Sequence, residues 1–296
     1  MSDPEKKREF EEFVRQGNAL PPALSLIHTT DFCRFEAIKT SGAISLSDDE
    51  VFKTAGKTVS EKKVIKTAGN ADSTSNDKVF IPGKPEKLVY FFYGRPSYRV
   101  NPDIKDTRVS SFAPICFVFK REFDCQIKRI HPFDTGAFDA GRLSGFVHST
   151  MAMSDYQLSP EILSAQCVVN AFYGNNSRYV DCLPSGAIEI EKIVKDRLFF
   201  VESYYFLIRY TPNVDSDERA HSIELQTDEV VYLKDNVLAV VVPDRFFDGE
   251  RIKEIRDLWN CLVVTYHLKN VFTPVNLMDL LMDKVREVLF ADGQLS

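Results

Sequence analysis

A histidine and two threonines follow the first apolar segment of the chain. His28, Thr29 and Thr30 come directly after residues 23–27, an apolar run of the length of a strand. An imidazole and neighbouring hydroxyls at a strand end can hydrogen-bond a ribose or a phosphate. A single histidine in such a position is more often a structural residue, so the segment supports both interpretations.

Aromatic rings and guanidinium groups share a second segment, residues 90–99 (YFFYGRPSYR). Tyr93 and Tyr98 offer rings that stack on planar groups, and Arg95 and Arg99 offer charge that pairs with a pyrophosphate. A glycine and a proline between them predict a tight turn, which would gather these side chains near one loop. The same pattern fits a buried aromatic strand, so it suggests a nucleotide site but is not diagnostic.

A glutamate lies within an alternating segment late in the chain, residues 221–226 (HSIELQ). On a strand, Ser222, Glu224 and Gln226 would share one face, and the apolar residues between them would point into the core. Such a row is often the solvated side of a strand. A carboxylate held on a rigid strand can also stabilise the positive charge of a sugar transition state.

Hydrophobic periodicity predicts the elements that would position these segments. Runs typical of strands occupy residues 23–28, 88–93, 113–120, 221–226, 237–242 and 261–266. Helical spacing occurs in residues 5–16, within an N-terminal segment 1–20, and in residues 32–41, 160–172, 251–262 and 275–289. Asp31 is a candidate N-cap and Gly42 a candidate stop for the second helix. Residues 133–152 contain several glycines and are expected to form a loop.

Residues 45–87 differ from the rest of the chain because they are polar and contain few large apolar side chains. We expect a mobile insertion near the mouth of the site, with residues 45–80 the most mobile internal part. It is either a solvated, partly helical insertion or a lid whose lysines meet an anionic target. No shift in composition divides residues 1–296 into two cores, so we expect one domain with a long insertion.

Composition excludes several classes of protein. The 296 residues are 44% hydrophobic and 27% charged, which excludes a fibrous or wholly disordered chain. The net charge of -6 argues against a protein that coats nucleic acid by bulk charge. The charged N-terminus and the short apolar runs predict no signal peptide and no contact with a membrane. Six cysteines without a CxxC pair predict free thiols in a reducing cytoplasm, and no spacing indicates a metal site.

Together the three segments resemble the ADP-ribosyltransferase superfamily in its His-Tyr-Glu class, and within it the DarT-like bacterial toxins. The first block is a strand that ends in His-x-Thr at His28, a short helix, and a small-Gly exit at residues 41–43. The last is a strand with Glu224, then an apolar strand that ends near Pro243. The resemblance implies an α+β fold with a split, twisted sheet and flanking helices, in which strands around His28, Tyr90 and Glu224 border one cleft.

The resemblance assigns one group of residues to binding NAD. His28 would hydrogen-bond the adenosine ribose, and Thr29 or Thr30 would support the adenine side. Arg95 or Arg99 would neutralise the pyrophosphate.

It assigns a second group to the reaction itself. Tyr93, or Tyr98 as the alternative, would stack on the nicotinamide ring. Glu224 would bind the 2′-hydroxyl of the nicotinamide ribose and stabilise the charge that develops as nicotinamide leaves. The expected catalytic residues are therefore Glu224, His28 and Tyr93. Gln226, which would share a strand face with Glu224, is counted among the NAD-binding residues.

The resulting hypothesis is an NAD-dependent ADP-ribosyltransferase that acts as an intracellular toxin or anti-phage defence effector. Its acceptor would be nucleic acid or protein, and an antitoxin or defence-system protein would be its partner. Arginine-modifying relatives often carry Glu or Gln two residues before the catalytic glutamate, and Ser222 at that position disfavours an arginine acceptor. One alternative is an inactive nucleotide-binding or interaction module of the same fold. Another is an unrelated α+β protein whose aromatic strands form an interaction surface.

Overall fold

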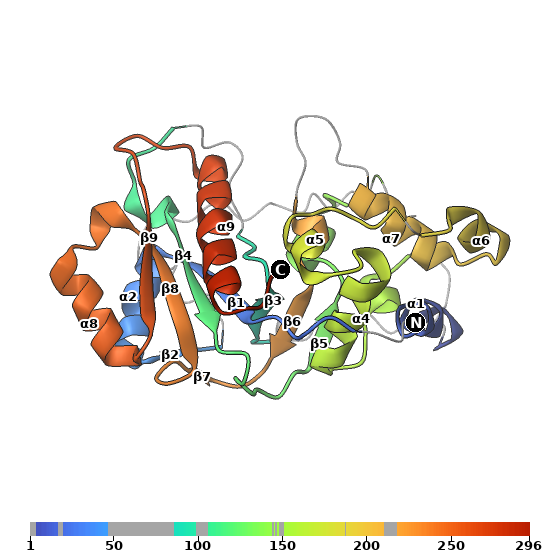
Figure 1. The fold of residues 1–296 in the computed structure, drawn as a ribbon, viewed down its shortest axis with the longest axis horizontal. Coiled ribbons are helices and arrows are strands. Elements are labelled where there is room, and N and C mark those ends of the chain that lie inside the picture. Colours follow the sequence, from blue (N-terminus) through green and yellow to red (C-terminus); the bar gives the residue numbers. More distant parts are fainter. Residues whose placement is uncertain are drawn as a thin grey trace, which may run out of the picture.

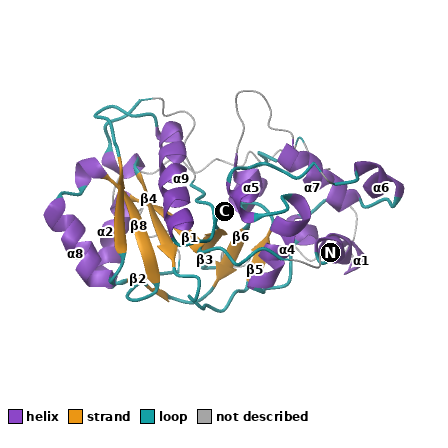
Figure 2. Ribbon diagram, in the orientation of Figure 1, coloured by secondary structure: helices purple, strands orange, loops and turns teal. Residues whose placement is uncertain are grey.

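The computed structural model describes residues 4–16, 20–46, 86–98, 106–143, 145, 147, 151–186, 188–209 and 218–296. These residues form a mixed α+β architecture around one large sheet (Figures 1 and 2). The predicted α+β class is therefore confirmed. Most of the polar segment 45–87, for which we expected mobility near the site, lies outside the described residues.

The main sheet has seven strands, in the spatial order β5 (Arg129–His131), β6 (Glu224–Thr227), β3 (Val89–Tyr93), β1 (Leu26–Asp31), β4 (Pro114–Phe119), β8 (Val237–Pro243) and β9 (Leu262–Tyr266). All neighbours are antiparallel except β8 and β9, which are parallel. A separate pair is formed by β2 (Ala43–Ile44) and β7 (Val231–Tyr232). Every residue of β4 is buried, because helices cover both faces of this part of the sheet.

Nine helices are present among the described residues: α1 (Pro4–Val14), α2 (Phe32–Ser41), α3 (Thr135–Asp139), α4 (Ile162–Phe172), α5 (Asn176–Val180), α6 (Ile190–Lys195), α7 (Phe199–Arg209), α8 (Gly249–Trp259) and α9 (Pro274–Ala291). Figure 1 shows α2 and α8 on one side of β4, β8 and β9, and α9 on the other. Phe35 of α2 and Trp259 of α8 both pack on Phe117 of β4, with ring centroids 5.9 and 5.5 Å away. These contacts join both helices to the centre of the sheet.

A second group of helices, α1, α4 and α7, packs together beside the β5 end of the sheet (Figure 1). Phe10 of α1 lies at the centre of this group, where its ring contacts those of Phe172 and Tyr204 at 5.9 and 5.3 Å. The buried apolar residues of both groups belong to one continuous core cluster.

Helix α2 follows the sequence prediction closely. The Asp31 carboxylate accepts a hydrogen bond from the Arg34 backbone N–H at 2.8 Å, as an N-cap does. Gly42 has a φ of 70°, and its N–H donates to the Ile38 carbonyl at 2.8 Å. The N-cap and the C-terminal stop are therefore the two residues predicted for these roles. Asp31 is also the last residue of β1, so the helix begins directly after the strand.

Several elements were not predicted, among them three short ones near the candidate residues. Residues 133–152, expected to be a loop, contain α3, and strand β5 and helix α5 had no prediction. A three-residue strand and two five-residue helices are too short to show a periodic pattern. The predicted strand 221–226 begins only at Glu224, so Ser222 precedes the strand and is itself buried.

No helix in the described ranges combines the length and the apolar character needed to span a membrane.

Candidate functional site

The three segments singled out in the sequence occupy three consecutive strands. β1 carries His28, β3 carries Tyr90 and Tyr93, and β6 carries Glu224, and β3 lies between the other two. Ile27 is paired with Phe92, and Phe92 is paired with Glu224 on its other side. Segments almost 200 residues apart in the chain, at His28 and Glu224, are thus two strands apart in the sheet.

The sheet divides at His28. The pairing of β1 with β3 covers Leu26 and Ile27, whereas β1 stays paired with β4 as far as Asp31. β3 likewise continues along β6. Across the opening, His28 Nδ1 donates a hydrogen bond to the Tyr90 carbonyl at 2.9 Å, in place of a backbone bond.

This contact defines the chemical state of His28. A carbonyl oxygen can only accept, so the proton of the neutral ring is on Nδ1 and Nε2 is an acceptor. Burial lowers the pKa of His28 to about 4, the bond to Tyr90 opposes this, and the charge of Arg34 lowers it further. Because this pKa is well below 7, His28 presents a neutral imidazole near pH 7.

Glu224 is held at the start of β6 and is only 2% exposed. Its Oε1 accepts from Thr135 Oγ1 at 2.7 Å and from Gln226 Nε2 at 2.6 Å, and its Oε2 accepts from the Thr135 backbone N–H at 2.9 Å. Burial raises the pKa of Glu224 to about 7, and the charge of Asp134 adds to this rise. The bonds from Gln226 and Thr135 act in the opposite direction because they favour the carboxylate.

The start of α3 brings Thr135 to the glutamate. Asp134 is the N-cap of this helix, and its Oδ1 accepts from the Ala137 backbone N–H at 2.9 Å. Its Oδ2 accepts from Ser97 Oγ at 2.6 Å. Asp134 is buried, so the turn after β3 and the first residue of α3 are fixed relative to Glu224.

A polar row extends from Glu224 along β5 and β6. Gln226 lies directly opposite Arg129, whose Nη1 donates to Gln226 Oε1 at 3.4 Å. His131, which is buried, lies directly opposite Glu224. Residues directly opposite in an antiparallel pair point to the same face, so these four side chains share a face.

The structure places Tyr93 away from any open surface. The ring is fully buried, and its hydroxyl accepts from the Leu24 backbone N–H at 2.9 Å. Tyr93 is therefore a core residue here and does not present its ring for stacking, contrary to the first choice made from the sequence. The alternative, Tyr98, is half-buried, and the charges of Asp31 and Arg34 act on its hydroxyl, which places it at the junction of β1 and α2.

Arg95 is also placed differently from the prediction. It is 3% exposed, and its Nη1 donates to the Val180 carbonyl at the end of α5. Its charge acts on His221, whose pKa is lowered to about 3, mainly by burial. The guanidinium thus connects the turn after β3 to α5, and its burial disagrees with the predicted role of an open partner for a pyrophosphate. Arg99, the other candidate, lies outside the described residues.

The pairing brings His28 and Glu224 near one another along the sheet without placing them on one face. Glu224 is level with Ile27, so alternation sends His28 to the opposite face, where its ring contacts Phe91 and Phe117 at centroid distances of 6.2 and 6.3 Å. Thr30, which shares the face of His28, is buried. The two side chains therefore lie on opposite faces of the sheet.

Five residues around Glu224 were not selected from the sequence: Ser97, Arg129, His131, Asp134 and Thr135. Asp134 was the one with a detectable signal, since an aspartate three residues before an apolar helical position is a common N-cap. Within the described ranges, no group of three or more His, Cys, Asp or Glu side chains is placed to hold a metal ion.

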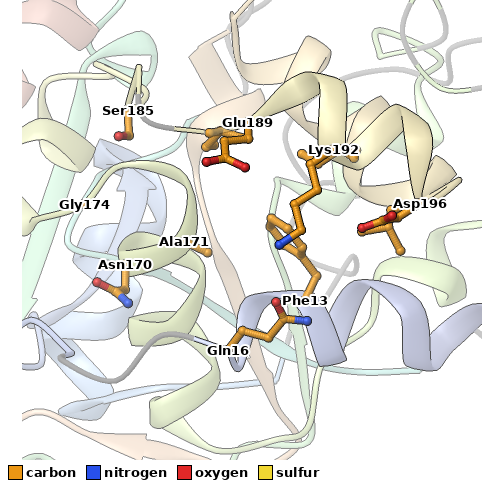
Figure 3. Close-up of a pocket in the computed structure, with 12 residues that line it drawn as sticks. Phe13, Gln16, Asn170, Ala171, Gly174, Ser185, Glu189, Lys192 and Asp196 are labelled. Carbon is orange, nitrogen blue, oxygen red and sulfur yellow. The ribbon is translucent and has the colours of Figure 1, made fainter.

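A cavity of about 640 Å³ is present elsewhere in the fold, where α1, α4 and α6 meet (Figure 3). Phe13 lies in it, and Asn170 and Lys192 are on its walls. None of its lining residues belongs to the segments described above, so the cavity is separate from the candidate site.

Comparison with known proteins gave no match to a family model, to a curated protein or to a solved structure.

Proposed function

We propose that the protein is an NAD-dependent ADP-ribosyltransferase of the His-Tyr-Glu class. One observation carries the proposal: the strands of His28, Tyr90 and Glu224 are adjacent in a sheet that divides at His28. The resemblance of the three short sequence blocks requires this neighbourhood, and the structure has it although His28 and Glu224 are almost 200 residues apart in the chain.

The reaction needs a fixed negative charge beside a ribose. When the bond between C1′ and the nicotinamide nitrogen of NAD breaks, nicotinamide keeps the electron pair and C1′ becomes positively charged. An acceptor oxygen or nitrogen then bonds to C1′ and releases a proton. Glu224 suits this role because three hydrogen bonds hold its carboxylate before the reaction, so little reorganisation is required.

His28 suits a role as hydrogen-bond acceptor. Its Nε2 has no proton near pH 7, so it can accept from a ribose hydroxyl and cannot repel the positive charge on C1′. Thr29, half-buried beside it, would support the adenine side. Tyr98 replaces Tyr93 as our choice for stacking on nicotinamide, because Tyr93 is enclosed by the core.

We propose that the group that receives ADP-ribose belongs to a nucleic acid or a protein. Ser222 stands two residues before Glu224, where arginine-modifying relatives often carry Glu or Gln, so an arginine side chain is disfavoured. A role as an intracellular toxin or defence effector, with an antitoxin or defence-system partner, follows from the resemblance alone.

Two observations favour a second candidate, an inactive nucleotide-binding module of the same fold. Glu224 is almost fully enclosed, and alternation directs His28 to the other face of the sheet. In that case the hydrogen bonds of Glu224 would serve stability alone.

Incubation with NAD labelled in the adenylate part tests the proposal and separates the candidates. The protein is mixed with separate pools of DNA, RNA and protein and with buffer alone. Label in one pool, lost in the Glu224→Gln variant and kept in Glu229→Gln, supports the transferase and identifies the acceptor class. Glu229 is an exposed glutamate near the end of the same segment, which makes it a matched control. Binding of NAD without loss of nicotinamide in any pool supports the inactive module.

A further inference from the structure

One residue, Thr135, contacts both oxygens of Glu224. Its hydroxyl donates to Oε1 at 2.7 Å and its backbone N–H donates to Oε2 at 2.9 Å. Two donors from one residue fix both the position and the rotation of the carboxylate plane, which a single hydrogen bond cannot do. The contact joins residues 89 positions apart, so it depends on the tertiary structure.

Thr135 is itself held from two directions. Asp134 precedes it and accepts from the Ala137 backbone N–H, so the backbone at Thr135 follows the first turn of α3. Ser97, in the turn after β3, donates to the other oxygen of Asp134 at 2.6 Å. Ser97 thus holds Asp134 by a hydrogen bond, and Thr135, the next residue in the chain, donates two hydrogen bonds to Glu224.

The other charged and titratable groups around the glutamate come from three elements. Asp134, at the start of α3, places a negative charge near it. His131 of β5 lies directly opposite, and Arg129 of β5 reaches the same row through Gln226. Gln226 and Thr135 donate hydrogen bonds to the carboxylate.

We propose that Thr135 is the positioning residue of the site, which fixes how Glu224 presents its carboxylate, and that Ser97 and Asp134 hold Thr135 in place. The consequence for turnover rests on the proposed function, whereas the effect on Glu224 itself does not. Thr135 acts through Glu224, and no contact of its own with a substrate is required.

The test replaces the hydroxyl while it keeps the shape of the residue. Thr135→Val removes Oγ1 and retains the backbone N–H, and Thr135→Ser restores the hydroxyl. Thr227→Val is the matched control, because Thr227 is a buried threonine of β6 on the face opposite to Glu224. Thermal unfolding of each variant establishes that it is folded before the measurement.

The readout is the titration of Glu224 in the full chain, followed by carboxyl-carbon NMR and assigned by the signal that Glu224→Gln removes. The hydrogen bond from the Thr135 hydroxyl favours the charged form of Glu224, so its loss should move the titration to higher pH by about one to two units. We expect Thr135→Val to titrate at a pH higher by about that amount, and Thr135→Ser and Thr227→Val to match the wild type. An unchanged titration in Thr135→Val, or an equal shift in Thr135→Ser, overturns the proposal.

Turnover separates this inference from the proposed function. If the wild type releases nicotinamide from NAD, the acidic limb of the pH–rate profile of Thr135→Val moves to higher pH and Thr135→Ser restores it. If the wild type releases none, the transferase proposal fails, and the NMR titration still decides whether Thr135 positions Glu224.

Discussion

The imidazole of His28 donates from Nδ1 to the carbonyl of Tyr90, on the strand from which β1 has just separated. The side chain replaces a backbone hydrogen bond that the division of the sheet would otherwise leave unmade. His28 therefore satisfies the Tyr90 carbonyl with Nδ1 and leaves Nε2 as a hydrogen-bond acceptor. The first contact stabilises the fold, and the second nitrogen is the one that the proposed binding of NAD requires.

The two functions of His28 can be separated by substitution. Asparagine places an amide N–H close to the position of Nδ1, so His28→Asn keeps a donor for the Tyr90 carbonyl and loses the Nε2 acceptor. We expect a folded variant whose NAD affinity falls about three- to tenfold, the effect of one neutral hydrogen bond. His28→Ala should lose affinity to at least the same degree and also lose stability. Calorimetric titration with NAD and urea unfolding measure the two effects, and equal NAD affinity in wild type and His28→Asn would remove His28 from the binding site.

The raised pKa of Glu224 predicts how stability depends on pH. The pKa of Glu224 is about 7 in the folded protein, above the usual value of 4.5. Between these two pH values the folded state holds a proton on Glu224 that the unfolded state has lost. Its contribution to stability is therefore present below about pH 4.5 and is lost as pH rises through about 7.

Glu224→Gln removes this dependence. Compared with the variant, the wild type should lose about 1–3 kcal/mol of unfolding free energy between about pH 5 and pH 8. Urea denaturation at both pH values gives the difference, and parallel curves for the two proteins would show that Glu224 titrates normally.

The placement of Arg95 predicts a defect in stability. Arg95→Met removes the donor to the Val180 carbonyl, and a hydrogen bond from a charged group contributes about 1.5–3 kcal/mol. Arg121→Met is the control, because Arg121 forms a partly exposed ion pair with Asp292 that should contribute at most about 1 kcal/mol. Urea unfolding compares the two variants. An Arg95→Met protein that is as stable as the wild type but binds NAD poorly would return Arg95 to the pyrophosphate role.

The two tyrosines should respond in opposite ways. Tyr93→Phe leaves the buried Leu24 N–H without its acceptor, which costs about 1–3 kcal/mol of stability, and NAD affinity should be unchanged. Tyr98→Ala should reduce NAD affinity about tenfold, because aromatic stacking on a base contributes about 1–3 kcal/mol. Thermal unfolding and NAD titration of both variants give the comparison. A loss of NAD affinity in Tyr93→Phe alone would reverse the assignment.

Local signals in the sequence were sufficient for the elements that carry the site. The cap at Asp31, the stop at Gly42 and the buried run of β8 depend on near neighbours, and the structure has all three. The alternation around Glu224 correctly predicted a strand. The strand starts later than predicted because Ser222 lies in the turn after a short 3-10 helix, where backbone geometry overrides the alternating pattern.

Partners that are distant in the sequence could not be predicted in this way. Thr135 reaches Glu224 across 89 positions, and Arg95 reaches Val180 across 85. A charged residue in a Gly-Pro turn is usually solvated, whereas Arg95 is buried and donates to the Val180 carbonyl at the end of α5. Tyr93 was chosen because it lies next to the predicted turn, but in the structure its ring is buried in the core.

The release of nicotinamide from NAD by wild type, Glu224→Gln and Glu229→Gln tests the central claim most directly. Glutamine keeps the size of the side chain and removes the charge that stabilises the ribose, so turnover should fall by roughly 100-fold or more, while NAD binding stays within a few-fold. Glu229→Gln should turn over at the rate of the wild type. Near-full turnover in a folded Glu224→Gln protein, or no turnover in the wild type with any acceptor, would contradict the assignment of Glu224 as the catalytic carboxylate.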